Sequence, residues 1–289
     1  MRVPDVLCLD LGGTGLKGAI VRGGKILKRA SAETDISDGI RGIKKTFCRL
    51  LSQFSEEEYE GIALSSAGEI DSEYQRVVYA TELLPEYTGF DLGKFFSGRT
   101  RKPFVCLNDG QAALFGECYA RGFESDNVAM LTLGTGVGGG VIKGGQPVNG
   151  GKLLSLGHLE LERGGLICTC GRRGCIEQYA SGSALTRLLR QRGIFCSKRE
   201  LWERYGSGDE EVRSAVGEWL KNLRRACDLV CERYPCRLIV LGGGVSDDGE
   251  SWFKDLQKSG RYKIELSVLG NDAGMVGAYA FYCGRAAFR

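Results

Sequence analysis

A cysteine-rich segment follows the only histidine of the chain. His158 precedes Cys168, Cys170 and Cys175, which lie among glycines and arginines. Thiolates and an imidazole together suit a closed tetrahedral zinc site, and glycine lets a backbone that wraps an ion adopt left-handed conformations. One residue separates Cys168 from Cys170, whereas paired zinc cysteines usually have about two to four residues between them. We therefore predict a structural zinc ion bound by these four residues; a cluster of buried free thiols is the alternative.

Two glycine-rich segments each follow an apolar, strand-like run. Their backbone N–H groups can approach and point at phosphate oxygens, because glycine has no side chain in the way. Asp10, near the end of the first run, can hold a magnesium ion directly or through water. The residues predicted to bind ATP and magnesium here are Asp10, Gly12, Gly13, Thr14, Gly134, Thr135, Gly136, Gly138 and Gly139. An ordinary hairpin loop is the alternative for each segment taken alone.

Neither segment matches the other common nucleotide-binding motifs. No Gly-Lys-Ser/Thr follows, as a P-loop requires. A strand rather than a helix follows each turn, unlike the dinucleotide-binding pattern. The two segments therefore predict a pair of hairpins that grip a polyphosphate from both sides.

Asp109 stands at the end of an expected strand and the start of an expected helix, beside Asn108. A carboxylate there can accept a proton from a substrate hydroxyl as a general base. The alternative is a helix N-cap, a role that aspartate fills well. The position alone favours the cap, and the two roles are compatible at one helix end.

The elements that would position these residues alternate between strands and helices. Strands are predicted over 6–11, 16–22, 26–32, 61–65, 104–107, 128–133, 137–142 and 238–241. Helices are predicted over 40–51, where apolar residues repeat, from residue 109, and over 273–285, where small residues share one face. A strand–glycine turn–strand unit therefore occurs twice, which indicates a duplicated α/β architecture. We expect a smaller domain over 1–119 and a larger one over 120–289 that carries the zinc loop 158–175; the helix over 273–285 can pack back onto the first domain.

The composition excludes several classes of protein. The 289 residues, 43% of them hydrophobic, suffice for two packed domains. A net charge of +3, from 39 basic and 36 acidic residues, is too balanced for a nucleic-acid-binding surface. We see no secretory leader and no apolar run that could span a bilayer. The twelve cysteines, among them Cys8, Cys106, Cys227 and Cys231 in apolar segments, indicate mostly buried, reduced thiols in a cytoplasmic protein.

These segments together resemble the ROK family of sugar kinases and repressors over nearly the whole chain. The motifs that carry the resemblance are Leu-Asp-Leu-Gly-Gly-Thr (9–14), Asn-Asp-Gly (108–110), Leu-Gly-Thr-Gly-Val-Gly-Gly-Gly (133–140), Gly-His (157–158), Cys-Thr-Cys-Gly-Arg-Arg-Gly-Cys-Ile-Glu (168–177) and Leu-Gly-Gly-Gly-Val (241–245). The resemblance implies a duplicated, actin-like (ribonuclease H-like) two-domain fold with ATP and sugar in the cleft between the domains. It also implies ATP-dependent phosphorylation of a hexose hydroxyl, which we expect to be O6.

The resemblance also implies roles for individual residues. Asp109 matches the catalytic base, and Gly242 and Gly243 match the adenosine-side loop. The positions that match or adjoin the sugar-binding residues are Gly68, Asn108, Ser155, His158 and Glu177. The implied cofactors are Mg²⁺ with ATP and a structural Zn²⁺. The expected partners are a sugar and ATP, with no nucleic acid and no membrane, in a homodimer or homotetramer.

The chain departs from the family pattern at two positions. Ser155 replaces a glutamate that binds sugar hydroxyls, and Leu83 stands where asparagine is frequent. Serine is shorter and uncharged, so it leaves space and removes a two-acceptor clamp; neutral drift is the alternative. The substrate is therefore open among N-acetylmannosamine, glucose and a β-glucoside.

Three functions from different classes fit the resemblance. An active sugar kinase keeps Asp10, Asp109 and both glycine turns, as this chain does. A transcriptional regulator would need an N-terminal helix-turn-helix domain, yet nine residues precede Asp10. A catalytically silent sugar-binding protein is suggested only by Ser155. We expect the kinase.

Overall fold

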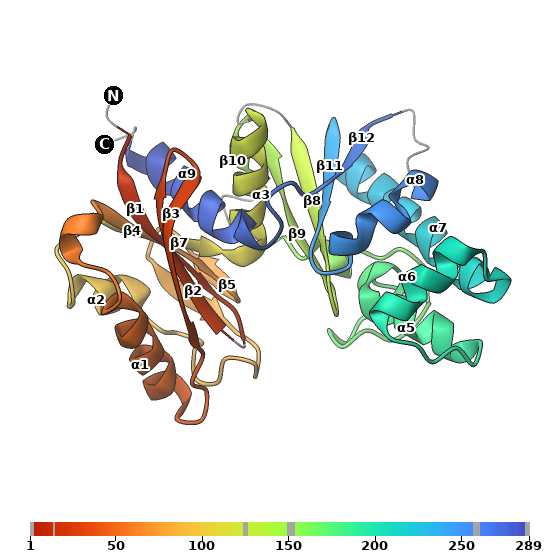
Figure 1. Ribbon diagram of the computed structural model, residues 1–289, viewed down its shortest axis with the longest axis horizontal. Helices are drawn as coiled ribbons and strands as arrows, with labels where there is room; N and C mark the ends of the chain where they lie inside the picture. Colours follow the sequence, from red (N-terminus) through yellow and green to blue (C-terminus); the bar gives the residue numbers. More distant parts are fainter. Residues whose placement is uncertain (1–2, 14, 124–126, 149–153, 257–260, 287–289) are drawn as a thin grey trace. The chain divides into compact units, whose positions relative to one another are not determined.

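The computed structural model divides the chain into two compact units (Figure 1). It describes residues 3–13, 15–123, 127–148, 154–256 and 261–286. The first unit comprises Met1–Glu124, Gln146–Leu153 and Asn271–Arg289, and the second comprises Ser125–Gly145 and Leu154–Gly270. The C-terminal helix therefore belongs to the first unit, although it follows the second in sequence.

The first unit contains a five-stranded mixed sheet with the order β3-β2-β1-β4-β7. Its strands are β1 (Asp5–Leu11), β2 (Gly15–Arg22), β3 (Lys25–Glu33), β4 (Gly61–Ser66) and β7 (Phe104–Asn108). The first three strands are antiparallel neighbours, and β1, β4 and β7 run parallel. A small separate hairpin consists of β5 (Glu69–Asp71) and β6 (Arg76–Tyr79).

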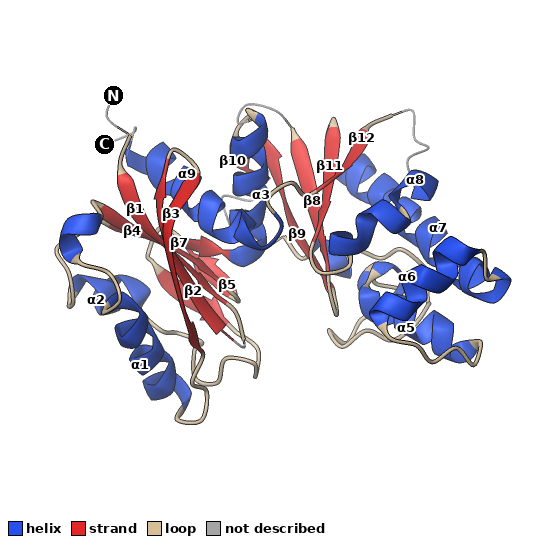
Figure 2. Cartoon of the chain, in the orientation of Figure 1, coloured by secondary structure: helices blue, strands red, loops and turns tan. Residues whose placement is uncertain are grey.

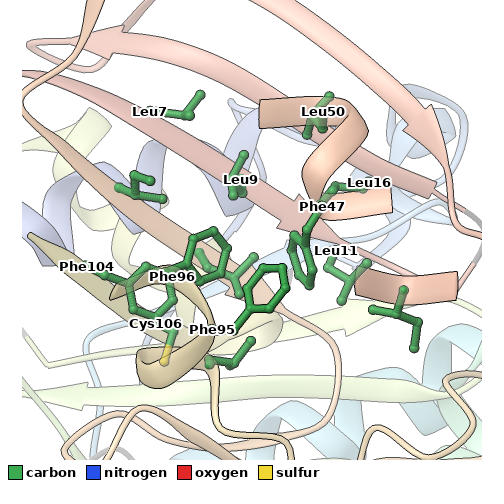
Figure 3. Close-up of a cluster of buried hydrophobic side chains, with 14 of the residues drawn as sticks. Leu7, Leu9, Leu11, Leu16, Phe47, Leu50, Phe95, Phe96, Phe104 and Cys106 are labelled. Carbon is green, nitrogen blue, oxygen red and sulfur yellow. The ribbon is translucent and has the colours of Figure 1, made fainter. Parts of the chain in front are cut away.

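Helices cover both faces of this sheet (Figure 2). Alternate residues of β1 face opposite sides, so Leu7, Leu9 and Leu11 pack against α1 (Gly39–Leu51) and α2 (Leu92–Ser97), as Figure 3 shows with Phe47 and Phe96. On the other face, Val6 and Cys8 belong to a cluster with residues of α3 (Asp109–Arg121) and α9 (Ala273–Ala286). Burial on both faces explains why β1, β4 and β7 are almost continuously apolar.

The second unit repeats this arrangement of strands. The second sheet has the order β10-β9-β8-β11-β12. The second unit supplies β8 (Val128–Leu133), β9 (Val137–Lys143), β11 (Leu238–Gly242) and β12 (Lys263–Leu266), and β10 (Gln146–Pro147) comes from the segment grouped with the first unit. As in the first unit, the first strand of a glycine hairpin pairs in parallel with the next strand of the sheet. The predicted α/β duplication is confirmed.

The helices of the second unit lie, in sequence, between β10 and β12. They are α4 (Glu177–Ala180), α5 (Gly182–Gln191), α6 (Lys198–Ser207), α7 (Glu210–Arg233) and α8 (Phe253–Leu256), with 3-10 turns η3 (Leu156–His158) and η4 (Ser246–Ser251). No helix among the described residues is long and apolar enough to cross a membrane. The twelve cysteines all lie within the described residues and form no disulfide; Cys8, Cys106 and Cys227 are buried, whereas Cys231 is only partly buried.

Candidate functional site

Asp10 lies near the carboxyl end of β1, where its side chain meets the neighbouring parallel strand. Its Oδ1 accepts a hydrogen bond of 2.7 Å from Ser65 Oγ on β4. Burial raises the pKa of Asp10, and the Ser65 hydrogen bond opposes this rise. Beside it, Gly12 N–H donates to the Gly15 carbonyl at 2.9 Å and closes the first glycine turn. Thr14 lies outside the described residues.

The first turn of α9 approaches Asp10 closely. A Cβ atom at Gly274 would lie 2.8 Å from Asp10 Oδ1 and 3.0 Å from Ser65 Oγ, so only glycine fits without a shift. The sequence analysis missed Ser65 and Gly274 as site residues. The small residues along 273–285 were the one sequence feature that could have indicated this close approach.

Asn108 caps α3, and Asp109 is the first residue of that helix. Asn108 Oδ1 accepts from the N–H groups of Gly110 and Gln111 at 3.0 and 3.2 Å. The interpretation of Asp109 as the N-cap is therefore wrong, because Asn108 occupies that position; Asp109 Oδ1 shares the Gly110 N–H at 2.8 Å. Asn108 Nδ2 donates to Asp109 Oδ1 at 2.8 Å and to the Gly68 carbonyl at 2.7 Å.

Asp109 is exposed at the start of α3, and the protein around its carboxylate perturbs its pKa. Surrounding protein raises its pKa to about 6 chiefly by desolvation, with a further contribution from the charge of Asp10, against hydrogen bonds from Gly110 N–H and Asn108. A carboxylate held near neutrality in this way can act as a general base. Asp10, Gly68, Asn108 and Asp109 thus gather at the carboxyl ends of β1, β4 and β7.

The four predicted zinc ligands of the second unit converge on one point. Their ligand atoms all lie within 4.8 Å of one another, with 3.5 Å between His158 Nδ1 and Cys168 Sγ and 3.7 Å between Cys170 Sγ and Cys175 Sγ. A tetrahedron with Zn–S bonds of about 2.3 Å and a Zn–N bond of about 2.0–2.1 Å has edges of roughly 3.5 Å (S···N) and roughly 3.8 Å (S···S). The two measured edges therefore fit zinc.

The loop around this cluster turns as the glycines predict. Gly171 and Gly174 have φ of 81° and 73°, in the left-handed region. Cys168 N–H donates to the Arg172 carbonyl at 2.8 Å, which closes the turn. Hydrogen bonds from Arg172 lower the pKa of Cys170, which favours the thiolate that binds metal.

The second glycine turn joins β8 to β9, as predicted. Gly134 N–H donates to the Gly136 carbonyl at 3.0 Å. Gly138 and Gly139, by contrast, lie within β9 and pair with β8. A Cβ atom at Gly139 would lie 1.9 Å from the Met130 carbonyl oxygen, so strand packing by itself explains that glycine.

A cavity of about 620 Å³ opens beside this turn. It is lined by Gly134 and Thr135, by α5, by the start of α6 and by Gly244 and Val245 after β11. Val245 N–H donates to the Leu133 carbonyl at 3.0 Å, which brings the loop that contains Gly242 and Gly243 beside the turn. The sequence analysis missed the apolar lining residues, which are Leu185, Leu189, Ile194, Phe195, Leu201 and Trp202.

Two further predicted site residues flank the cysteine–histidine cluster. Ser155 is exposed, and its side chain makes no capping hydrogen bond to η3. Glu177 is partly buried, and its Oε2 accepts a hydrogen bond of 3.2 Å from Val137 N–H. Ser155 is therefore free for a ligand, whereas one oxygen of Glu177 already has a backbone partner.

Known proteins resemble the chain over almost all of its length. A model of the ROK family matches residues 6–284. The chain is 32% identical over 286 residues to a Haemophilus influenzae protein named N-acetylmannosamine kinase, covering 94% of this chain and 93% of that protein. It is 29% identical over 300 residues to a Thermotoga maritima protein named glucokinase, covering 93% and 94%.

The fold also matches solved structures. A ROK family glucokinase from Streptomyces griseus, solved in complex with glucose and AMPPNP, superimposes with a TM-score of 0.75 at 28% identity, covering 96% of this chain and 98% of that chain. The actin-like fold expected from the sequence is confirmed.

Proposed function

This chain belongs to the ROK family and is an ATP-dependent sugar kinase, and we propose that it phosphorylates O6 of a hexose or an N-acetylhexosamine. The observation that carries the proposal is the exposed Asp109 carboxylate, which Asn108 holds from Nδ2 while the same amide also donates to the Gly68 carbonyl. Asp109 takes the proton of the attacking hydroxyl, and Asn108 holds the carboxylate in place. General-base help of this kind is worth about 10²–10⁴-fold in rate.

Phosphoryl transfer depends mainly on positioning and charge stabilisation. We assign phosphate contacts to the first turn at Gly12 and Gly13, with Thr14, and to the second turn at Gly134–Gly136, with Gly138 beyond it. Asp10 is the residue that would hold Mg²⁺, directly or through water, and that ion neutralises phosphate charge when bound. We assign no phosphate contact to Gly139, because its packing against Met130 in the strand pair already requires glycine.

The adenosine is proposed to occupy the cavity beside the second turn, next to Gly242 and Gly243. The volume of about 620 Å³ is typical of ligand pockets. Its apolar lining, including Ile194 and Phe195, suits the faces of a purine. Glycine at the loop lets the backbone approach the nucleotide.

The proposed zinc ion is structural, because three thiolates and His158 would leave no open position. When bound, it holds the loop that carries Glu177. We assign sugar contacts to Gly68, Asn108, Ser155, His158 and Glu177. Because Ser155 is short and uncharged, we propose an N-acetylated hexosamine or a β-glucoside in preference to glucose; the name of the Haemophilus influenzae relative supports the first.

A kinase assay across a panel of sugars tests the proposal. ATP consumption is measured with glucose, N-acetylmannosamine, N-acetylglucosamine, fructose and β-glucosides, and NMR of the product identifies the phosphorylated oxygen. We expect ATP consumption that depends on sugar, and a product that carries phosphate on O6. Sugar binding without turnover would instead favour the silent sugar-binding protein or the regulator.

We further propose that the protein acts in the cytoplasm, where its free thiols stay reduced, as a homodimer or homotetramer. Light scattering of purified protein at several concentrations measures the assembly, and a monomer at all concentrations would contradict it.

A further inference from the structure

Residues on both sides of the metal-ligand cluster in sequence contact the second glycine turn. Gly157 directly precedes His158, and a Cβ atom at Gly157 would lie 1.9 Å from the Val137 carbonyl oxygen. Glu177 follows Cys175 by two residues, and its Oε2 accepts from Val137 N–H at 3.2 Å. Both backbone polar groups of Val137, the residue that ends the turn, are therefore in contact with segments tied to the cluster.

Gly136 provides the space that the Glu177 carboxylate occupies. A Cβ atom at Gly136 would lie 2.1 Å from Glu177 Oε2. The φ of Gly136 is not in the left-handed region, so an L-residue is compatible with its backbone. The carboxylate, and not the conformation of the turn, is therefore what requires glycine here.

The segment that follows the short helix α4 also contacts the turn, at Gly134. Gly182, just after α4, donates its N–H to the Gly134 carbonyl at 2.8 Å. The helix is held at both ends, because Ile176 N–H donates to the Leu159 carbonyl at 2.9 Å and Trp219 Nε1 donates to the Ser181 carbonyl at 3.1 Å. Glu177 thus projects from a fixed support.

We propose that Glu177 is a positioning residue for the nucleotide: its carboxylate holds the turn 134–137 in the shape that receives phosphate, and the metal cluster fixes the carboxylate. This rests on the proposed function, which makes the turn a phosphate-binding element. Without the carboxylate, a glycine-rich turn gains conformational freedom. The free energy needed to order the turn then weakens nucleotide affinity.

If Glu177 acted only through its charge, its removal would change nucleotide affinity in the opposite direction. A carboxylate near phosphates repels them, so the loss of charge alone would tighten nucleotide binding. Glu177→Gln separates the two effects, because glutamine keeps an oxygen that accepts from Val137 N–H but carries no charge. Positioning predicts that glutamine restores binding where alanine weakens it.

The experiment is calorimetric titration of the full chain with Mg·AMPPNP in the absence of sugar. Glu177→Ala and Gly136→Ala are each expected to raise Kd about tenfold, as for a lost hydrogen bond to a charged group, while Glu177→Gln stays within about threefold of wild type. The double variant should bind no more weakly than either single variant, because each already displaces the carboxylate. Gly217→Ala, where a Cβ atom meets nothing within 4 Å, is the matched control.

A second arm tests the connection to the metal. Chelation is followed by zinc content and circular dichroism together with AMPPNP affinity. Loss of zinc should raise Kd in wild type but change it much less in Glu177→Ala. Should wild type bind AMPPNP while Glu177→Ala and Gly136→Ala bind it equally well, the positioning role is overturned and the proposed function stands. Failure of wild type to bind AMPPNP would overturn both.

Discussion

Asn108 donates a 2.8 Å hydrogen bond from Nδ2 to Oδ1 of Asp109 while its own Oδ1 caps the helix that Asp109 begins. Asn108 therefore serves as the helix cap, and Asp109, the first residue of the helix, carries the carboxylate that we assign to catalysis. The hydrogen bonds to the Asp109 carboxylate from Asn108 Nδ2 and from Gly110 N–H both end on Oδ1, so Oδ2 is the oxygen that we assign to the substrate proton.

Removal of Asn108 should shift the pH profile of the reaction. Asp109 acts as a base only when deprotonated, so the rate should rise with pH through the raised pKa of about 6. The Asn108 hydrogen bond lowers this pKa, and Asn108→Ala should therefore move the acid limb of kcat to higher pH. Loss of the cap should also cost about 1 kcal/mol of stability. An unchanged acid limb would show that another group sets it.

Gly274→Ala should impair magnesium-dependent catalysis more than folding. The added Cβ would press on Asp10 Oδ1 and Ser65 Oγ, at 2.8 and 3.0 Å. We expect a higher KM for Mg·ATP and a lower kcat. Gly284→Ala in the same helix is the control, because a Cβ atom there meets nothing within 4 Å; similar kinetics in the two variants would refute the role of the contact.

The metal cluster should bind about one zinc ion per chain. Cys170→Ser should lower both zinc content and Tm, because metal binding is linked to folding. Cys48→Ser, at another exposed free thiol, should change neither. Metal analysis and thermal unfolding measure the two effects. Zinc-free protein of equal stability and activity would contradict the assignment.

Ser155 should determine the choice of sugar. We expect a lower kcat/KM for glucose than for an N-acetylated hexosamine or a β-glucoside, and a reversed order in Ser155→Glu. A hydrogen bond to a charged group is worth roughly 1.5–3 kcal/mol, so the change in the ratio of kcat/KM values should exceed about tenfold. A strong preference of wild type for glucose would mean that another residue supplies the clamp.

Local patterns in the sequence predicted the strands of the first sheet, β8, β9 and β11 of the second, the two glycine hairpins and the cysteine–histidine cluster, because each depends on residues close together in the chain. The short strands β5, β6, β10 and β12 were missed. The cap at Asn108 was missed, since Asn108 and Asp109 are both good capping residues at one strand-to-helix junction. Contacts between distant segments, such as Gly274 with Asp10 and Glu177 with Val137, depend on tertiary packing. The lining of the cavity by α5 and α6 left no local signal for the same reason.

The most direct test of the central claim is the turnover of Asp109→Asn on the sugar that wild type phosphorylates best. Asparagine has the same shape but cannot take the proton, and the helix keeps its cap at Asn108. We predict that kcat falls by about 10²-fold or more while sugar affinity and Tm are retained. A variant that keeps more than about a tenth of the wild-type kcat would show that Asp109 is not the catalytic base.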